Sequence, residues 1–332
     1  MAAALAFCAA GEIPPPWQEA VGPISAASLR GHVFFLASDL LEGRDTPSRG
    51  LDLAAEYIAS QFRRAGLDPA GGDTYFQTGP ASQDGADLPP AQNVAALLLG
   101  SDPLLRETAI ILSAHYDHLG LKPDGDGDRI FNGANDDASG TAAVIEIAQA
   151  LASLPIRPKR TILFIAFYGE ERGMLGSNHY VEHPLWPLDR TVANLNLEHL
   201  GRTDSTEGPQ LRRASVTGFD YSDIGDIVRQ IGALTGIAVH HHPENSDKFF
   251  PQSDNIVFAR QGIPAHSICA AFLYPDYHTP ADHWDKLDYE NMATLTRMIA
   301  LALLTLAEHD QPPRWNEHSE QAAPFRERAV RR

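Results

Sequence analysis

Three short apolar runs in the first half of the sequence constrain the fold more than any other feature. Residues 93–99, 109–114 and 161–168 each have the length of a strand and are apolar almost throughout. Between the second and third runs, residues 141–154 place apolar side chains at helical spacing. Continuously apolar strands that alternate with helices belong to a sheet covered on both faces. The sequence therefore predicts an α/β fold.

Other elements follow from the same patterns. Strands are predicted at residues 192–197, 213–217 and 265–268, and helices at 28–41, 51–65, 221–234 and 289–306. Residues 71–91 are rich in Gly, Pro and Asp and are predicted to form a loop. Residues 311–332 are polar and contain proline, so we expect a loose tail.

The beginning of the chain is typical of the end of a secretory signal. Residues 1–11 form a short apolar run that closes on small residues, and a Pro-rich stretch follows. We therefore expect residues 1–24 to be a signal-peptide remnant and leader, and the protein to be secreted or periplasmic. A disordered N-terminus of a cytosolic protein is the alternative. No later stretch approaches the roughly 18 apolar residues of a membrane span.

Charge and cysteine content exclude several classes of function. The 26 basic and 43 acidic residues give a formal charge of −17, with no basic stripe to neutralise phosphates. Nucleic acid and anionic membrane are therefore not expected as partners. Cys8 and Cys269 are the only cysteines, which excludes a Cys-based zinc site.

Five short motifs carry metal-binding side chains, and each lies beside a predicted strand end or helix start. They contain His115 and Asp117, Asp136 and Asp137, Glu170 and Glu171, Glu198, and His278. Ligand sites in open α/β sheets gather beyond the carboxyl ends of the strands. We therefore expect these side chains to converge on one site.

The first motif follows a buried strand. Residues two apart on an extended segment point the same way, so Asp117 can accept the second ring N–H of His115 while the other ring nitrogen binds a metal. A surface His–Asp pair is the alternative interpretation. His118 is expected to be a bystander.

The acidic pairs are harder to explain without metal. A helix N-cap accounts for one aspartate at 136–137 but not for two, and a carboxylate can bridge two cations. Glu170 and Glu171 leave the most apolar strand, where burial is costly without compensation. Their side chains diverge, so Glu171 can bind metal while Glu170 faces the reacting water.

The ligand count suits two zinc ions. Two histidines, two terminal carboxylates and one bridging aspartate, with a shared water, give four ligands to each ion. Mn²⁺ or Co²⁺ would also accept this mixed N/O set. Such a site activates water and polarises a carbonyl group.

As a set, these motifs resemble those of the zinc exopeptidases, which include secreted bacterial double-zinc aminopeptidases, glutamate carboxypeptidase and glutaminyl cyclase. The similarity runs from residues 37–44 to the His-Thr-Pro-Ala-Asp motif at 278–282 and on to residues 285–288. It implies a three-layer αβα sandwich with a central mixed, mostly parallel sheet. It also implies a single zinc peptidase domain at residues 25–310, since the chain has no long insertion between Tyr75 and Asn93 for a protease-associated domain.

The resemblance assigns roles to the ligands. It implies that Asp136 bridges two zinc ions, that His115 and Glu198 hold one of them, and that Glu171 and His278 hold the other. Similar aminopeptidases usually have Asp where this chain has Glu198, and Met where it has His199.

The resemblance also assigns the catalytic side chains. Glu170 would be the general base, Asp117 would orient His115, and Tyr277 would stabilise the oxyanion. A cis peptide bond is expected between Asp136 and Asp137.

The leading hypothesis is a metallo-aminopeptidase acting on peptides with a free N-terminus. A carboxypeptidase of the same fold would need a cationic clamp, for which loops offer Arg202, Arg212, Arg213 and Lys248. A glutaminyl cyclase should not need both halves of the ligand set. A non-catalytic binding module would not be expected to keep Glu170 and all five ligands.

Three other segments have simpler interpretations. His240-His241-His242 is expected to be a solvated loop, because three consecutive side chains diverge. Residues 249–254 resemble the segment that lines the specificity pocket of the family, although packing on the core explains them equally well. Residues 272–275 are expected to add an apolar wall.

Overall fold

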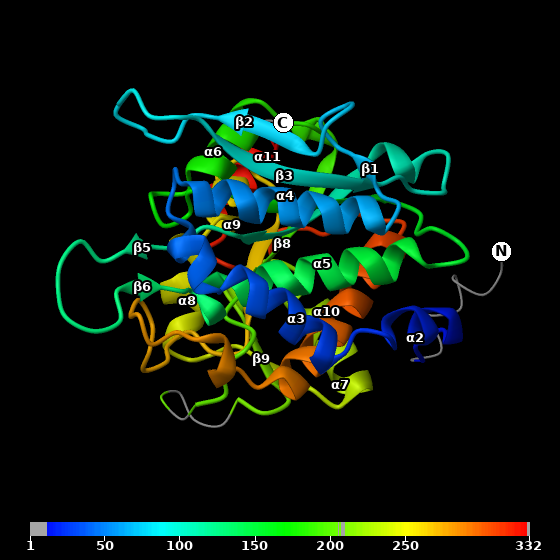
Figure 1. Cartoon of the computed structure of the whole chain (residues 1–332). Helices are drawn as coiled ribbons and strands as arrows, with labels where there is room; N and C mark the ends of the chain where they lie inside the picture. Colours follow the sequence, from blue (N-terminus) through cyan, green and yellow to red (C-terminus); the bar gives the residue numbers. More distant parts are fainter. Residues whose placement is uncertain (1–11, 205, 207–209, 331–332) are drawn as a thin grey trace.

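The computed structural model describes residues 12–204, 206 and 210–330. Its centre is a nine-stranded sheet with the order β1-β3-β7-β4-β8-β11-β9-β10, in which β2 pairs with β3 (Figure 1). The strands are β1 (Asp68–Pro69), β2 (Phe76–Gly79), β3 (Ala91–Leu98), β4 (Ala109–His115), β7 (Thr161–Phe167), β8 (Thr191–Glu198), β9 (Arg213–Val216), β10 (Ala238–His240) and β11 (Ala265–Cys269). A separate small sheet pairs β5 (Gly120–Leu121) with β6 (Ile130–Phe131).

The sheet is mixed, and its parallel part is the centre. The strands β7, β4, β8 and β11 run parallel to one another. Antiparallel pairing joins β3 to β7 and β9 to β11 on either side of this group. Each of the strands β4, β7 and β11 is buried along its whole length, as their continuous apolar character predicts.

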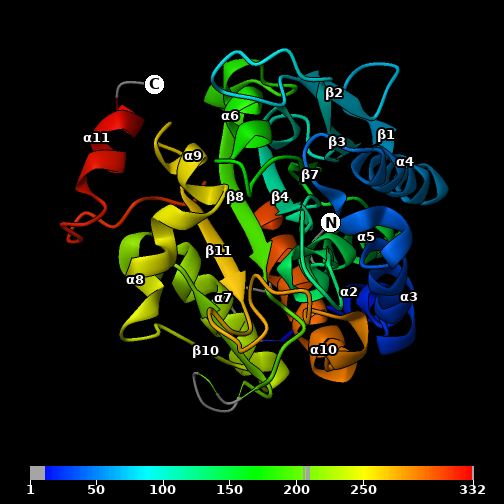
Figure 2. The same ribbon diagram turned by 60° about the vertical axis from the view of Figure 1, so that its left-hand side comes forward.

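Helices cover both faces of the sheet, which confirms the predicted three-layer αβα sandwich (Figures 1 and 2). One face carries α2 (Pro15–Val21), α3 (Ala26–Leu36), α4 (Arg49–Arg64), α5 (Ser139–Ala152), α7 (Ile224–Thr235) and α10 (Tyr289–Glu308). The other carries α6 (Leu175–Glu182), α9 (Asn255–Ala259) and α11 (Ala323–Val330). Successive side chains of β4 point to opposite faces of the sheet and pack in both helix layers. Ile110 and Leu112 belong to one hydrophobic cluster, and Ala109 and Ile111 belong to the other.

The structure corrects the sequence predictions at several short elements. The expected loop at 71–91 contains β2, and α6, α8 (Asn245–Phe249) and α9 were not predicted, because segments of five to eight residues show little periodicity. The predicted helix at 28–41 ends at Leu36, and a 3₁₀ segment, Asp39–Arg44, follows it.

The C-terminal segment is packed and not loose. Trp315 is 5% exposed, its indole N–H donates to the carbonyl of Gly262 (3.0 Å), and its ring stacks on Phe325. The prediction failed because these two aromatic residues stand alone in a polar stretch. They pack on the core through tertiary contacts that hydrophobic periodicity does not register.

The structure describes only part of the segment that was expected to be a signal remnant and leader. Residues 1–11, the expected signal remnant, lie outside the described residues, and α2 forms within the expected leader. Across the described part of the chain, no helix combines the length and apolarity needed to cross a membrane.

Candidate metal centre

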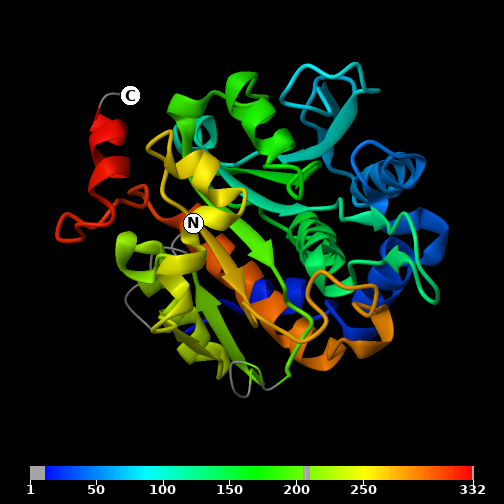
Figure 3. The same ribbon diagram turned by 90° about the vertical axis from the view of Figure 1, so that its left-hand side faces the viewer.

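The candidate metal-binding side chains meet at one edge of the sheet, where the central parallel strands end. His115 is the last residue of β4, Glu198 is the last residue of β8, and Glu170 and Glu171 follow β7. Figures 2 and 3 show β8 and β11 running side by side toward this edge. His278 comes from the chain after β11. The side chains therefore lie together at the carboxyl ends of the strands, as expected.

Asp136 lies at the centre of this cluster. One of its carboxylate oxygens, Oδ1, lies 3.1 Å from His115 Nε2, and the other, Oδ2, lies 3.0 Å from His278 Nε2. Glu198 Oε2 lies 3.6 Å from His115 Nε2, and Glu171 Oε1 lies 3.2 Å from His278 Nε2. The five side chains thus form two groups that share Asp136.

The spacing within each group fits a zinc ion. Tetrahedral zinc with bonds of about 2.0–2.1 Å separates its ligand atoms by roughly 3.3 Å. The distances from each histidine nitrogen to its two carboxylate oxygens, 3.0–3.6 Å, bracket this value. Oε1 of Glu171 is buried and accepts no hydrogen bond within the described residues, which suits an atom that binds a cation. These residues could therefore hold two ions.

Electrostatic effects around Asp136 favour a cation at the same place. Burial alone would raise the pKa of Asp136, but hydrogen bonds from His115, His199 and His278 outweigh it and hold that pKa well below its ordinary value. Burial lowers the pKa of His278, yet Asp136 and Glu171 outweigh burial and raise it to about 10. The carboxylates thus stabilise positive charge at the position of His278.

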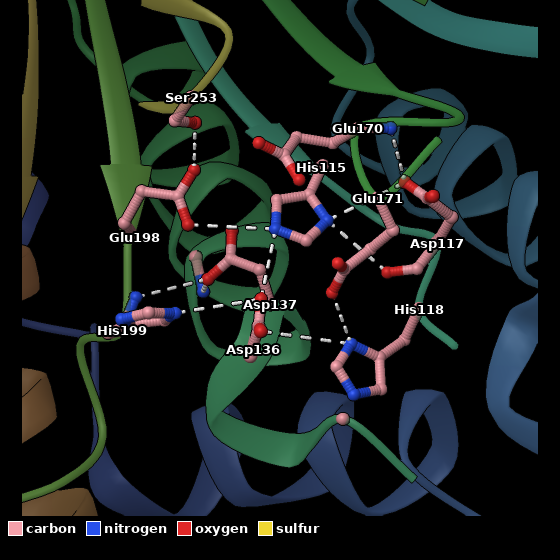
Figure 4. A network of polar contacts seen from close by, with 12 residues as sticks. His115, Asp117, His118, Asp136, Asp137, Glu170, Glu171, Glu198, His199 and Ser253 are labelled. Atoms are coloured by element: carbon pink, nitrogen blue, oxygen red, sulfur yellow. Dashed lines mark hydrogen bonds and ion pairs between the residues drawn. The ribbon is translucent and has the colours of Figure 1, made fainter. Parts of the chain in front are cut away.

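Asp117 has the geometry of an orienting residue. Its Oδ1 lies 3.5 Å from His115 Nδ1, and its backbone carbonyl oxygen lies 3.3 Å from the same nitrogen (Figure 4). Contact with Nδ1 leaves Nε2, the other ring nitrogen, directed at Asp136 and Glu198. A metal-binding histidine is commonly fixed in this manner.

Glu170 belongs to the same cavity but not to either group of ligand atoms. Burial raises the pKa of its carboxyl group well above the ordinary value, and the neighbouring Glu198, Asp254 and Glu171 raise it further. A carboxyl group with a raised pKa is suited to take up a proton and to return it during a reaction.

Tyr277 stands at the rim of the cavity. Its ring stacks on His278, with centroids 3.9 Å apart, and meets His199 edge to face at 5.4 Å. Burial raises the pKa of the phenol, so the hydroxyl group remains a hydrogen-bond donor.

His118, the expected bystander, lies inside the site. The residue is 1% exposed, and its Nδ1 lies 2.8 Å from Glu171 Oε1 and 3.9 Å from Asp136 Oδ2. Neither Nδ1 of His118 nor Oε1 of Glu171 has a hydrogen bond among the described residues, and His118, Asp136 and Glu171 offer ligand atoms close enough together to hold a metal ion. The expectation was wrong because spacing alone does not reveal that His118 turns back toward the chain that follows β7.

Two more residues of the site escaped the sequence analysis. His199, noted only as a departure from the family pattern, directs Nε2 toward Asp136 Oδ1 at 3.6 Å and lines the cavity. Arg44 is fully buried and donates to the carbonyl oxygens of Tyr116, Asn132 and Gly133, which flank the ligand segments. Neither role follows from local spacing.

The loop that carries Asp136 is held from both sides. Asp282 accepts hydrogen bonds from the backbone N–H groups of Asn135 and Asp136 at 3.0–3.1 Å. Asp137 Oδ1 accepts from Gly140 N and His199 N. The Asp136–Asp137 peptide bond is cis, as expected.

A cavity of about 540 Å³, including its open mouth, adjoins the ligand groups. It is lined by His115, Asp136, Glu170, Glu171, Glu198, His199, Thr217, Phe249, Gln252, Ser253, Ser267, Cys269, Phe272, Tyr277 and His278. Phe249 and Phe272 stack with ring centroids 5.2 Å apart and form one wall. Phe250 instead packs on Tyr221 and Phe325 in the core, so both interpretations of residues 249–254 hold in part.

The histidine run lies elsewhere. His240 belongs to β10, and His241 pairs with Asp220 (3.1 Å) and Asp247 (3.5 Å). The rings of His240 and His242 lie with their centroids 6.3 Å apart, so only His241 is separated from its neighbours, and the expected solvated loop is wrong for His240, which ends a strand.

Comparison with known proteins identifies the family. The model of Peptidase family M28 matches residues 93–303. Aminopeptidase YwaD of Bacillus subtilis is 27% identical over 215 residues, which cover 62% of this chain and 42% of YwaD. The chain thus spans less than half the length of that relative.

Two solved structures share the fold. The LapA aminopeptidase of Legionella pneumophila superposes with a TM-score of 0.70 at 21% identity, over 90% of this chain and 77% of LapA. The glutaminyl cyclase of Porphyromonas gingivalis gives 0.65 at 18% identity, over 84% and 97% of the two chains. With the family model covering well over half of its residues, the chain belongs to Peptidase family M28.

Proposed function

We propose that this chain is a zinc-dependent aminopeptidase that removes N-terminal residues from peptides with a free N-terminus. The observation that carries the proposal is the position of Asp136, whose two carboxylate oxygens face two separate groups of ligand atoms beside one cavity. His115 and Glu198 would hold one zinc ion, and Glu171 and His278 the other. YwaD and LapA are aminopeptidases by name, which agrees with this activity.

Individual residues of the chain would have separate roles in the reaction. Two zinc ions, when bound, supply an activated water and polarise the scissile carbonyl group. Glu170 would accept a proton from the attacking water on its carboxylate and pass it to the leaving amine. The Tyr277 hydroxyl group would donate to the developing oxyanion. Asp117 would keep the ring of His115 in place.

The charge of the cavity favours an aminopeptidase over a carboxypeptidase. Among the described residues that line it, four are carboxylates and none is Lys or Arg. A carboxypeptidase needs a cationic group to bind the substrate carboxylate. Arg202 is paired with Asp204 and Asp276, and Lys248 lies over the ring of Phe249.

Two other functions remain as alternatives. A glutaminyl cyclase shares the fold, as the Porphyromonas gingivalis structure illustrates, but a cyclase does not require both ligand groups. A non-catalytic module would not need Glu170 in the cavity beside the ligands. We also propose residues 25–310 as the catalytic domain and a secreted or periplasmic location, the latter on the sequence of residues 1–11 alone.

A substrate panel tests the proposal. Aminoacyl anilides with free and acetylated amines, peptides with amidated C-termini and N-terminal glutaminyl peptides would be assayed with zinc. We expect hydrolysis of every substrate with a free amine, including amidated peptides, and about two zinc ions per chain by elemental analysis. Cleavage that requires a free carboxylate, or formation of pyroglutamate alone, would replace the proposal with one of the alternatives.

A further inference from the structure

A row of polar side chains crosses the middle of the apolar sheet and leads to Glu198. Ser113 on β4 and Ser267 on β11 are each paired in register with Asn196 on β8. All three residues are at most 2% exposed. Polar groups in such a position are costly unless their hydrogen bonds are satisfied, so the row needs an explanation beyond packing.

The hydrogen bonds of this row run in one direction. Asn194 Nδ2 donates to Ser113 Oγ (2.8 Å), Ser113 Oγ donates to Asn196 Oδ1 (2.8 Å), and Asn196 Nδ2 donates to Glu198 Oε1 (3.0 Å). Asn194, Asn196 and Glu198 alternate along β8 and therefore share one face of the strand. The hydrogen bond from Asn196 to Glu198 is accepted by a charged carboxylate, and such bonds are stronger than those between neutral groups.

Ser253 completes the arrangement from another part of the chain. Its hydroxyl group donates to Glu198 Oε1 (Figure 4). The same hydroxyl oxygen accepts a hydrogen bond of 2.9 Å from Asn196 Nδ2. Two donors therefore hold Oε1, while Oε2 faces His115 Nε2 at 3.6 Å. The carboxylate is turned so that one oxygen points to the polar row and the other to the ligand group.

We propose that Asn196 and Ser253 are positioning residues that make Glu198 a one-oxygen ligand of the cation it shares with His115 and Asp136. This inference rests on the proposed function, since it concerns the same metal centre. With Oε1 engaged by two donors, Oε2 alone is free to bind. Without them, the carboxylate could rotate and bind through both oxygens, or withdraw.

The position of Ser253 adds a connection to substrate binding. Ser253 directly follows Gln252, and both residues line the cavity together with Phe249. A substrate side chain that displaces this wall also moves a donor to Glu198. The size of the substrate's first side chain should therefore affect kcat through the metal ligand, in addition to its effect on KM.

The test compares Ser253→Ala with Ser267→Ala. Both serines are buried, line the cavity and contact Asn196 Nδ2, but only Ser253 contacts Glu198. Zinc would be removed by chelation, and its return would be followed by calorimetric titration of the full-length protein. We expect Ser253→Ala to weaken one of the two zinc sites by about 10- to 100-fold. Ser267→Ala removes a contact of Asn196 but none of Glu198, so any loss of zinc affinity should be much smaller than in Ser253→Ala.

Spectroscopy of the Co²⁺ protein and a variant that restores the hydroxyl group distinguish the positioning of Glu198 from a general loss of structure. In the Co²⁺-loaded protein, Ser253→Ala should change the visible absorption bands, because a second Glu198 oxygen raises the coordination number. Ser253→Thr retains the hydroxyl group and should restore both the zinc affinity and the spectrum. In a Glu198→Asp background, where the shorter side chain no longer reaches Ser253, the effect of Ser253→Ala should disappear.

The outcomes distinguish the two proposals. If the parent protein binds two zinc ions and cleaves free-amine substrates while Ser253→Ala binds zinc as the parent does, the positioning role is refuted and the proposed function stands. Equal losses in Ser253→Ala and Ser267→Ala, or additive losses in the Glu198→Asp background, also refute it. A parent protein that binds no zinc refutes both.

Discussion

The backbone N–H of Glu170 donates a hydrogen bond of 3.1 Å to Oδ1 of Asp117. The same carboxylate oxygen faces the ring of His115, so one aspartate contacts both a candidate ligand and the backbone of the candidate base. The segment after β7 is thereby tied to the segment after β4 at the point where their functional side chains emerge. Asp117 thus supports two functions with one side chain.

This double contact makes Asp117→Asn informative. The amide preserves size but loses the charge that stabilises the His115 ring, so zinc affinity and kcat/KM should each fall by about 10- to 100-fold. Zinc titration and steady-state kinetics measure the two effects. An unchanged zinc affinity with a lower kcat would place the effect on Glu170 alone and contradict the orienting role.

Glu170→Gln should separate catalysis from metal binding. Glu170 lies outside both ligand groups, so the variant should keep its zinc while kcat falls by about 10²- to 10⁴-fold, the usual contribution of a general base. Elemental analysis and kinetics on the same preparation test this. Glu308→Gln is a suitable control, because Glu308 bonds the backbone of Lys159 near the opposite end of β7. Full turnover by Glu170→Gln would overturn the mechanism.

His266 should make stability depend on pH. The ring is fully buried between the Thr217 carbonyl (2.8 Å) and the Ser222 hydroxyl (2.6 Å), and burial lowers its pKa from 6.5 to about 4. Between these values the unfolded chain binds the extra proton, so this contribution is complete above pH 6.5 and is lost as the pH falls toward 4. At pH 5 the loss is about 2 kcal/mol.

Urea unfolding of the parent and of His266→Gln at pH 7 and pH 5, at fixed zinc concentration, isolates this effect. The amide can both donate and accept, so the variant should lose less stability between the two pH values than the parent does. Equal losses in the two proteins would show that His266 is not buried in its neutral form.

Trp315 should anchor the C-terminal segment. Because its indole is buried and hydrogen-bonded to Gly262, Trp315→Ala should lower the free energy of unfolding by about 3–5 kcal/mol. Val330→Ala, at a side chain that is 84% exposed, should change it by less than about 0.5 kcal/mol. Denaturant midpoints measure both. A small effect at Trp315 would mean that the segment contributes little to stability.

The sequence predicted those parts of the structure that depend on local pattern. Apolar runs identified the central strands, and acidic residues at their ends identified the side chains that surround Asp136. The parts that it did not predict depend on which residues of neighbouring strands lie opposite one another in the sheet. Nothing local to Asn196 indicates that it lies between Ser113 and Ser267, and nothing near Ser253 points to Glu198. Such pairings exist only once β4, β8 and β11 are side by side.

The packing of the C-terminal segment has a consequence for the order in which the site is completed during folding. Phe250, three residues before Ser253, rests on Phe325, and Gly262 lies so close to Ala329 that an added Cβ would come within 2.5 Å of its backbone nitrogen. The candidate metal ligands all precede this segment in the sequence and lie at the ends of the central strands, so they can come together before the segment packs. The cavity wall that contains Phe249 and Ser253 should therefore reach its final position only after the ligand groups have formed.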